Sequence, residues 1–433
     1  MNLGESIHKP LNDLQVSIEA NRCLYCYDAP CMAACPTHID VASFINNIAT
    51  GNMKGSAQDI LLANPMGASC ARVCPTDELC EGACVFHADD TPIRIGDLQR
   101  YSIDWLMHSG TKLFEAGVPT GKSVAIVGGG PAGLSAARDL RLLGHAVTMF
   151  EARTQLGGLN TYGIVPFRLS MDVALWEAQQ VVDLGVEVRT GVRIGEDVSV
   201  ESLLSDYDSV VLACGMGSVP TLGIPGEELT GVWDALDLIE RVKTGGAIGD
   251  LGKNVVVIGA GNTAIDALTC AKRMGVDRVT MYYRRGESDM TAYDFEVEFA
   301  KQEGIEFRFF CAPVRLYGTD DHVTAVEFVR TNVRDGNVQS IAGSEFLEPV
   351  SAVIRAIGQS RLMQTLQAFG IASDGGVVRV DDALQTTRPG VFAAGDCIYE
   401  KGAREAMVVE AAQQGKTVAR SVHAHLLTGA ARG

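Results

Sequence analysis

Two separate segments of this chain share one order of local signals: a short β-branched run, a glycine-rich turn, a helical stretch and a second short run. In the first segment, the expected first strand is 123–127, the turn 128–133, the helix 134–143 and the second strand 146–150. The second places the same elements at 255–258, 259–261, 262–274 and 278–283. This order predicts a βαβ unit within a parallel sheet. Two such units predict an α/β fold with two Rossmann-like dinucleotide-binding domains.

The first turn, GGGPAG at 128–133, has the spacing G-x-G-x-x-G directly after a strand. Its glycines permit a tight turn and close approach of a pyrophosphate, which the free N–H groups of the helix start would bind. Glu151 ends the second strand, where a carboxylate accepts hydrogen bonds from ribose hydroxyls. A later strand at 390–393 runs into Gly395-Asp396, which resembles the second motif of two-dinucleotide flavoproteins, with Asp396 on the ribityl chain. These features predict an FAD site at Gly128, Gly130, Pro131, Ala132, Gly133, Glu151, Gly395 and Asp396.

The second turn reads GAGNTA at 259–264, with Ala264 in place of the third glycine. Its second strand ends in Arg284 and Arg285 instead of an acidic residue. Two guanidinium groups suit a 2′-phosphate and favour NADPH over NADH. The alternative is that both arginines are solvated surface charges. The sequence therefore predicts a site for NADP(H) or NAD(H) at Gly259, Ala260, Gly261, Asn262, Thr263, Arg284 and Arg285.

Eight of the 12 cysteines lie between Cys23 and Cys84, in runs of C-x2-C-x4-C-x3-C-P and C-x3-C-P followed by C-x3-C. Ferredoxin-type runs that end in Cys-Pro bind iron–sulfur clusters and send their fourth cysteine to the other cluster. This logic assigns a first 4Fe–4S cluster to Cys23, Cys26, Cys31 and Cys84. It assigns a second to Cys35, Cys74 and Cys80. The last ligand of the second cluster stays open, and Cys70 is the ordinary candidate because thiolate is the usual ligand.

Zinc is the alternative metal, since four-cysteine zinc sites also use C-x2-C pairs. The two Cys-Pro dipeptides and the asymmetric spacing favour iron–sulfur clusters. The remaining cysteines are expected to be buried packing thiols: Cys214, Cys270, Cys311 and Cys397. No C-x-x-C pair occurs outside the cluster region, which disfavours the chemistry of thioredoxin reductase.

Composition excludes several other classes of protein. The 433 residues include 36 Lys plus Arg and 53 Asp plus Glu, a formal net charge of −17. An acidic surface repels phosphate backbones, so nucleic acid is not an expected partner. No apolar run approaches the ~20 residues that span a bilayer, and the first residues show no secretory signal. We therefore expect a cytoplasmic protein without a membrane segment.

Five motifs give the chain a resemblance to the dihydropyrimidine dehydrogenase family: RCLYC at 22–26, CPTHID at 35–40, NPMG at 64–67, RVCPT at 72–76 and PIRIGDLQ at 92–99. The likeness runs from Arg22 to Lys416 and is to the flavin- and iron–sulfur-bearing half, which also occurs as a separate NAD(P)H-dependent subunit in bacteria. The small subunit of glutamate synthase is expected to be a more distant relative.

The resemblance implies further site residues. Gln99 would complete the second cluster and leave Cys70 without a ligand role. Leu159 and Arg168 would touch the flavin, and Ala356-Ile357-Gly358 would face the nicotinamide nucleotide. The loop around Arg168 departs from the family pattern, because its proline, Pro166, stands one position later. A family arginine associated with NADPH is replaced by Thr291, which weakens that preference, and the separate bacterial subunits are generally associated with NADH.

The expected function is electron input: NAD(P)H reduces FAD, and electrons leave through two 4Fe–4S clusters to a partner subunit in a hetero-oligomer. That partner would carry FMN and iron–sulfur centres and reduce uracil or thymine. No catalytic acid or base is expected in this chain. The alternatives are the small subunit of glutamate synthase and a redox-sensing scaffold. The expected domains are a helical iron–sulfur domain at 1–112, an FAD domain at 113–245 and 366–433, and an NAD(P) domain at 246–365.

Overall fold

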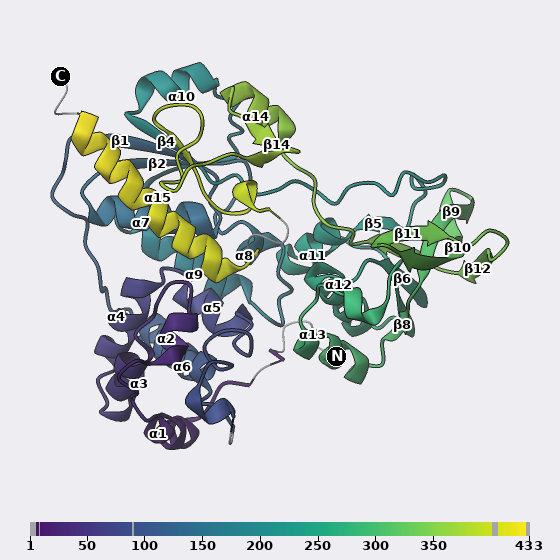
Figure 1. Ribbon diagram of the computed structural model, residues 1–433, viewed down its shortest axis with the longest axis horizontal. Coiled ribbons are helices and arrows are strands. Elements are labelled where there is room, and N and C mark those ends of the chain that lie inside the picture. Colours follow the sequence, from purple (N-terminus) through teal and green to yellow (C-terminus); the bar gives the residue numbers. More distant parts are fainter. Residues whose placement is uncertain (1–5, 8, 89–90, 401–405, 430–433) are drawn as a thin grey trace. The chain divides into compact units, whose positions relative to one another are not determined.

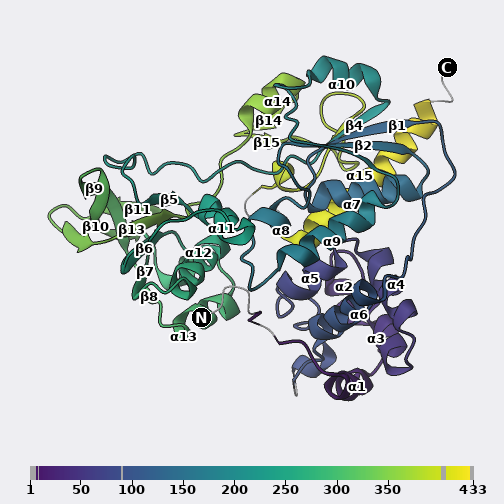
Figure 2. The same cartoon turned by 180° about the vertical axis from the view of Figure 1, so that it is seen from behind.

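The computed structural model describes residues 6–7, 9–88, 91–400 and 406–429. The chain divides into two compact units. The larger unit contains Ile7–Thr161, Met171–Met216 and Arg361–Gly433, and the smaller contains Tyr162–Ser170 and Gly217–Ser360. Figures 1 and 2 show their elements from opposite sides.

In its described residues before 112, the larger unit contains no strand and several helices. They are α1 (Asp13–Arg22), α2 (Pro30–Ala34), α3 (Val41–Ala49), α4 (Met53–Ala63), α5 (Gly67–Val73), the 3-10 helix η1 (Val85–His87) and α6 (Ile95–Ser109). Polar side chains begin several of them: Asn12 and Gln15 form a capping box on α1, and Asp40 accepts a hydrogen bond from the Ser43 amide on α3. Their apolar faces enclose Phe44, Ile45, Ile60, Leu98 and Ile103, all fully buried.

A five-stranded parallel sheet forms the rest of the larger unit, in the order β16 (Val391–Ala393), β4 (Ser209–Leu212), β1 (Ser123–Val127), β2 (Ala146–Glu151) and β3 (Glu187–Thr190). Its helices are α7 (Pro131–Leu142), α8 (Leu159–Tyr162, ending in the smaller unit), α9 (Met171–Val182), α10 (Val200–Asp206), α14 (Met363–Phe369), η3 (Asp396–Ile398) and α15 (Val408–Gly429). The short pair β14 (Ser373–Asp374) and β15 (Val377–Val378) is antiparallel. Helix α15 packs along α7 (Figures 1 and 2).

The smaller unit has its own parallel sheet, in the order β5 (Val232–Asp234), β13 (Ala352–Arg355), β6 (Asn254–Ile258), β7 (Arg278–Tyr282) and β8 (Glu306–Arg308). Its helices are α11 (Ala235–Thr244), α12 (Asn262–Arg273), η2 (Glu287–Asp289) and α13 (Asp294–Gln302). An antiparallel sheet follows, with β9 (Cys311–Thr319), β10 (His322–Arg334), β11 (Asn337–Ser340) and β12 (Phe346–Pro349).

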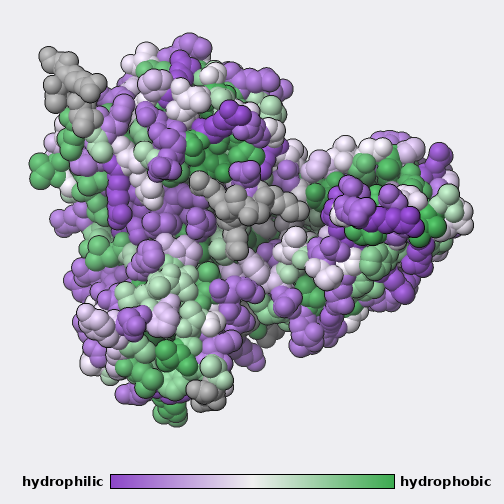
Figure 3. All heavy atoms as spheres, in the orientation of Figure 1, coloured by the Kyte–Doolittle hydropathy of each residue, from purple (hydrophilic) through white to green (hydrophobic). Residues whose placement is uncertain are grey.

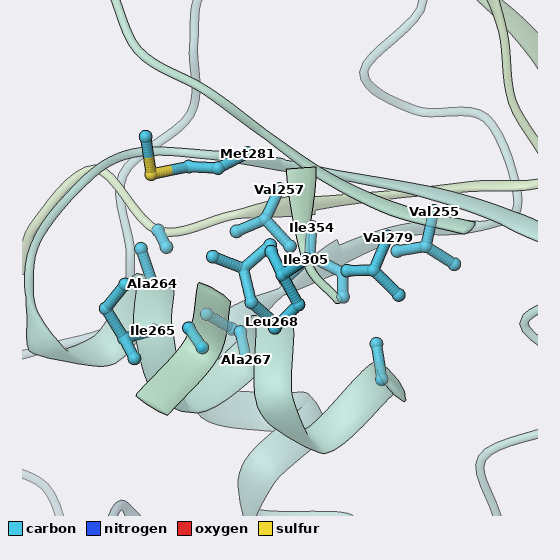
Figure 4. Packing of buried hydrophobic residues seen from close by; sticks show 14 of the residues in the cluster. Val255, Val257, Ala264, Ile265, Ala267, Leu268, Val279, Met281, Ile305 and Ile354 are labelled. Atoms are coloured by element: carbon cyan, nitrogen blue, oxygen red, sulfur yellow. The ribbon is translucent and has the colours of Figure 1, made fainter. Parts of the chain in front are cut away.

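Strand β6 packs against hydrophobic side chains on both faces of the parallel sheet. Val255 and Val257 point into a cluster with Leu268 of α12 (Figure 4). Their neighbours Val256 and Ile258 belong to a second cluster, in which Tyr282 stacks on Phe328 of the antiparallel sheet with ring centroids 3.9 Å apart. A strand buried on both faces is a continuous apolar run, as the sequence NVVVI shows.

The expected βαβ elements are present within one to three residues of their predicted bounds. The compact units divide the chain at 216/217 and 360/361, whereas the expected domain boundaries were 245/246 and 365/366. The reason is β5, which pairs with β13 and so brings 217–245 into the smaller unit. A three-residue strand gives too weak an alternation signal to be assigned from sequence.

Candidate functional sites

The glycine turn after β1 can be formed only by residues without a side chain. Gly128 has φ +109°, and a Cβ there would lie 2.2 Å from the carbonyl oxygen of Ala213. A Cβ on Gly133 would lie 2.0 Å from the Gly128 oxygen. Gly130 is the N-cap of α7 and offers no capping side chain, while Pro131 and Ala132 begin the helix. The first N–H groups of α7 are therefore free for a phosphate.

The side chain of Glu151 is hydrogen-bonded to this turn. It is 8% exposed, and its two carboxylate oxygens accept hydrogen bonds from the amides of Gly129 and Arg153 at 2.7 and 2.8 Å. The carboxylate thus lies at the glycine turn, as a ribose-binding acid would. Its contact with a ribose stays a prediction.

Gly395 and Asp396 lie at the same edge of the sheet. They follow β16, which pairs with β4, and β4 pairs with β1. The Gly395 amide donates to Oε1 of Gln414 at 2.7 Å, and a Cβ on Gly395 would lie 2.9 Å from the Cβ of Ala132. Burial raises the pKa of Asp396, which the nearby Arg361 partly offsets. The carboxyl edge of a parallel sheet is where nucleotides bind in such folds.

Leu159 and Arg168 have different surroundings. Leu159 is 40% exposed and begins α8 directly after Gly158, on which a Cβ would lie 2.8 Å from the Gly130 Cα. The Arg168 guanidinium belongs to the smaller unit and pairs with Asp266 at 3.0 Å and Glu296 at 2.5 Å. Its predicted contact with the flavin stays a prediction, and its carboxylate partners were not foreseen.

This buried ion cluster contains a second cation. Lys243 of α11 is 8% exposed and donates to the carbonyl of Ile164 at 2.8 Å. Burial lowers the pKa of Lys243 to about 7, and burial raises that of Glu296 to about 7 against the attraction of Arg168. The cluster holds the loop 162–170 to α11, α12 and α13. The only sequence signal was Asp266 between the apolar residues Ile265 and Ala267.

The second glycine turn repeats the first. Gly259 has φ +135°, and a Cβ would lie 2.1 Å from the carbonyl oxygen of Ala356. Gly261 caps α12 without a side chain, and Asn262 and Thr263 are the first helical residues. Ala264 is fully buried in place of the third glycine.

The expected nucleotide-facing residues at 356–358 lie beside this turn. Ala356 follows β13, which pairs with β6, and its amide donates to the Ile258 carbonyl at 2.8 Å. Ile357 is 39% exposed, and Gly358 has φ +99°. The structure thus brings the two segments together at one sheet edge.

Arg284 and Arg285 follow β7. Arg284 is exposed and Arg285 half-buried. Their carbonyls accept from the Thr331 hydroxyl at 2.9 Å and the Phe310 amide at 3.1 Å. Within the described ranges, neither guanidinium has a hydrogen-bond or ion-pair partner. Both are free to bind an anion.

The structure brings Cys23, Cys26, Cys31 and Cys84 to one cavity, which Val41, Ile45 and Phe86 also line. Cys84 is therefore beside the first cysteine run, from which more than fifty residues separate it in the sequence. Burial raises the pKa of the Cys31 thiol to about 11 and also raises that of Cys23. Buried neighbouring thiols do not ionise together unless a cation compensates their charge, so this donor set fits an iron–sulfur cluster.

Cys35, Cys74 and Cys80 form a second group. Burial raises the pKa of Cys80, to which the charges of Glu81 and Cys35 add. The contact with Cys70 and burial raise the pKa of Cys74, to which repulsion from Cys80 and Cys35 adds. Cys70 is also here, and its contact with Cys74 contributes most to the raised pKa of Cys74. Gln99 is 6% exposed, and its amide donates to the Gly67 carbonyl at 2.7 Å. Cys70 thus lies on α5, the helix that ends at Cys74, and Gln99 of α6 contacts the first residue of the same helix.

Among the described residues, no three His, Cys, Asp or Glu side chains converge as the ligands of a single metal ion. Three of the four other cysteines are buried, as expected for packing thiols, and Cys214 is half-buried. Cys214 and Cys397 are hydrogen-bonded to each other. No helix in the described part of the chain is long and apolar enough to cross a membrane.

These sites define a class of protein. Residues 122–415 match the family model for pyridine nucleotide-disulphide oxidoreductases, and the chain belongs to that family. Residues 2–111 match the model for the 4Fe–4S cluster domain II of dihydropyrimidine dehydrogenase. The chain is thus an NAD(P)H-dependent oxidoreductase subunit with FAD and 4Fe–4S clusters, and the expected fold class and cofactors are confirmed.

The relatives include two kinds of enzyme subunit. The small chain of NADPH-dependent glutamate synthase from Escherichia coli is 33% identical over 96% of this chain and 92% of its own length. The NAD-dependent dihydropyrimidine dehydrogenase subunit PreT of Salmonella typhimurium is 32% identical over 94% of both chains. The identities do not make glutamate synthase the more distant relative, so that expectation is not supported.

A solved structure confirms the fold. Mycobacterium tuberculosis FprA in complex with NADPH superposes with a TM-score of 0.59 at 20% identity, over 72% of this chain and 86% of that one.

Proposed function

We propose that this chain is the electron-input subunit of a dihydropyrimidine dehydrogenase, in which Cys23, Cys26, Cys31 and Cys84 bind one cluster and Cys35, Cys74 and Cys80 bind another. The observation that carries the proposal is that two glycine turns for nucleotides and two groups of neighbouring, buried or half-buried thiols occur in one chain. An electron-input subunit needs both glycine turns and both thiol groups, whereas a scaffold does not need a nucleotide-binding turn beside each of the two parallel sheets.

The chain's own residues bind and orient. The free N–H groups of α7 and α12 bind the two pyrophosphates, and Asp396 and Glu151 fix the sugar chain of the flavin nucleotide. Arg284 and Arg285 take the 2′-phosphate of NADPH, since both guanidinium groups are unpaired in the described structure. Bound FAD supplies the hydride-accepting chemistry, so alignment matters more than a side-chain acid or base.

The first cysteine group is the candidate exit for electrons. Leu24, Tyr27 and Val85 stand beside these cysteines in the sequence and are exposed by 61%, 105% and 45%. Leu14 and Ile18 add an exposed apolar face on α1, and hydrophobic surface gathers over this end of the larger unit (Figure 3). Exposed apolar patches mark protein interaction sites. We infer that the partner subunit docks here.

Residues around the second cysteine group favour a pyrimidine-reducing partner. Thr37 is buried, and its hydroxyl lies 3.3 Å from the Cys35 sulfur. Asp40 caps α3, and Gln99 is buried beside Gly67. These residues belong to the two motifs, CPTHID and PIRIGDLQ, that resemble the dihydropyrimidine branch.

The test is anaerobic co-purification with candidate large subunits, followed by iron, sulfide and flavin counting. The expected result is NAD(P)H oxidation dependent on uracil or thymine. Glutamate formation from glutamine and 2-oxoglutarate would instead assign the chain to glutamate synthase. A subunit that contains flavin and clusters yet fails to reduce ferricyanide with NAD(P)H would overturn electron input altogether.

A further inference from the structure

Lys416 is a buried lysine on α15, and it donates hydrogen bonds to two main-chain carbonyls. It is 6% exposed, and its ammonium donates to the Thr37 carbonyl at 3.4 Å and to the Ala63 carbonyl. Thr37 lies two residues after Cys35, and its hydroxyl oxygen lies 3.3 Å from the Cys35 sulfur. The lysine therefore places its charge beside the second cysteine group.

Lys416 shares its carboxylate neighbour with a second cation. Asp139 attracts Lys416 and also pairs with Arg138, whose Nε lies 2.8 Å from Oδ1. Arg420 adds a further positive charge but is exposed to solvent. A buried cation without a carboxylate of its own is costly unless another anion is close. A cluster held by the thiolates of Cys35, Cys74 and Cys80 would be that anion.

Three consecutive residues of α15, at 414–416, contact three different parts of the larger unit. Gln414 accepts from the Gly395 amide at 2.7 Å, so it touches the flavin motif. A Cβ on Gly415 would lie 2.3 Å from the Ala132 carbonyl, so α15 contacts the start of α7 without a gap. Successive helix residues point about 100° apart, and the next one, Lys416, reaches the loop after Cys35 and the end of α4. Figures 1 and 2 both show α15 along α7.

We propose that the ammonium of Lys416 raises the reduction potential of the cluster bound at Cys35, Cys74 and Cys80, an inference that rests on the proposed ligands. Reduction adds one negative charge to a cluster. A positive charge fixed nearby in the protein interior, where screening is weak, stabilises the reduced form. Lys416 is thus a positioning residue that favours transfer from the flavin to this cluster and leaves the other cluster unaffected.

The experiment is an anaerobic redox titration of the full chain, followed by electron paramagnetic resonance. Lys416→Gln keeps an N–H donor for the carbonyls but removes the charge. It should lower the reduction equilibrium constant of one cluster about tenfold, which is about 59 mV for one electron, and leave the other unchanged. Lys416→Arg should restore the wild-type potential. Lys122→Met, which removes a half-exposed lysine paired with Asp208, is the matched control and should change neither cluster.

Two results would overturn the inference: unchanged potentials in Lys416→Gln with full iron content, or equal shifts of both clusters. Lys416→Met is a second uncharged variant. If Lys416→Gln loses a cluster, the potentials of Lys416→Met provide the test, and the reverse also holds. A wild-type chain with no second cluster would instead refute the proposed ligands. The two failures are therefore distinguishable.

Discussion

Glu177 of α9 provides a sharp test of how the iron–sulfur helices are attached to the flavin-binding sheet. It is 2% exposed, and its carboxylate accepts from the Ala68 amide at 2.8 Å and the Ser69 hydroxyl at 2.5 Å. The Ser69 hydroxyl accepts in turn from Asn160 at 2.9 Å. These contacts join α9 and α8 to α5, the helix that carries Cys70.

Burial raises the pKa of Glu177 from 4.5 to about 7, although these hydrogen bonds pull it down. Between pH 4.5 and about 7, therefore, the carboxyl group is protonated in the folded state and ionised in the unfolded state. The resulting stabilisation is complete below the unfolded pKa and is lost as pH rises through about 7. At 1.36 kcal/mol per pH unit, the interval corresponds to about 3.4 kcal/mol.

Glu177→Gln keeps the shape and an acceptor oxygen but cannot titrate. The free energy of unfolding of the wild type, relative to the variant, should fall by about 3 kcal/mol between pH 5 and 8. Thermal unfolding of the flavin-loaded chain at several pH values measures this as a difference in Tm that changes by several °C. Glu187→Gln, which removes an exposed carboxylate paired with Arg189, is the control and should give parallel curves. A constant Tm difference for Glu177→Gln, or one of opposite trend, would refute the reasoning.

Three further changes test the sites. Gly128→Ala should abolish FAD binding, because its Cβ meets a backbone oxygen at 2.2 Å; Gly121→Ala has the same sign of φ but open space, and should retain flavin absorbance. Replacing Arg284 and Arg285 by Ala should raise the KM for NADPH at least tenfold more than that for NADH; equal changes would contradict the 2′-phosphate assignment. Cys84→Ser should remove one cluster, and full iron and sulfide content after anaerobic purification would refute the ligand set.

The parts of the fold that were predictable are those where the backbone dictates the residue. Gly128 and Gly259 have positive φ and face a carbonyl at close range, so only glycine fits, and the requirement is visible as a motif. The strand runs before them were equally clear, since a doubly buried strand is continuously apolar. Motif and strand together located both glycine turns and the sheet edges beside them, while the binding of nucleotides there stays a prediction.

The buried ion cluster could not be predicted, because nothing in the backbone requires it. Arg168, Asp266, Glu296 and Lys243 come from a loop and three helices, and their pairing depends on how those elements pack. Glu296 and Lys243 read in the sequence as ordinary surface charges, and the family resemblance linked Arg168 only to the flavin. Cys214 and Cys397 follow the same rule: they are distant in sequence and meet because β4 and β16 are neighbours in the sheet.

Helix α15 shows how a segment without any motif can connect several sites. None of the motifs identified in the sequence falls within α15 (Val408–Gly429). Because consecutive helical residues point in different directions, Gln414, Gly415 and Lys416 contact Gly395, the start of α7 and the loop after Cys35 in turn. These contacts connect three segments that lie far apart in the sequence, and they arise only when the helix packs.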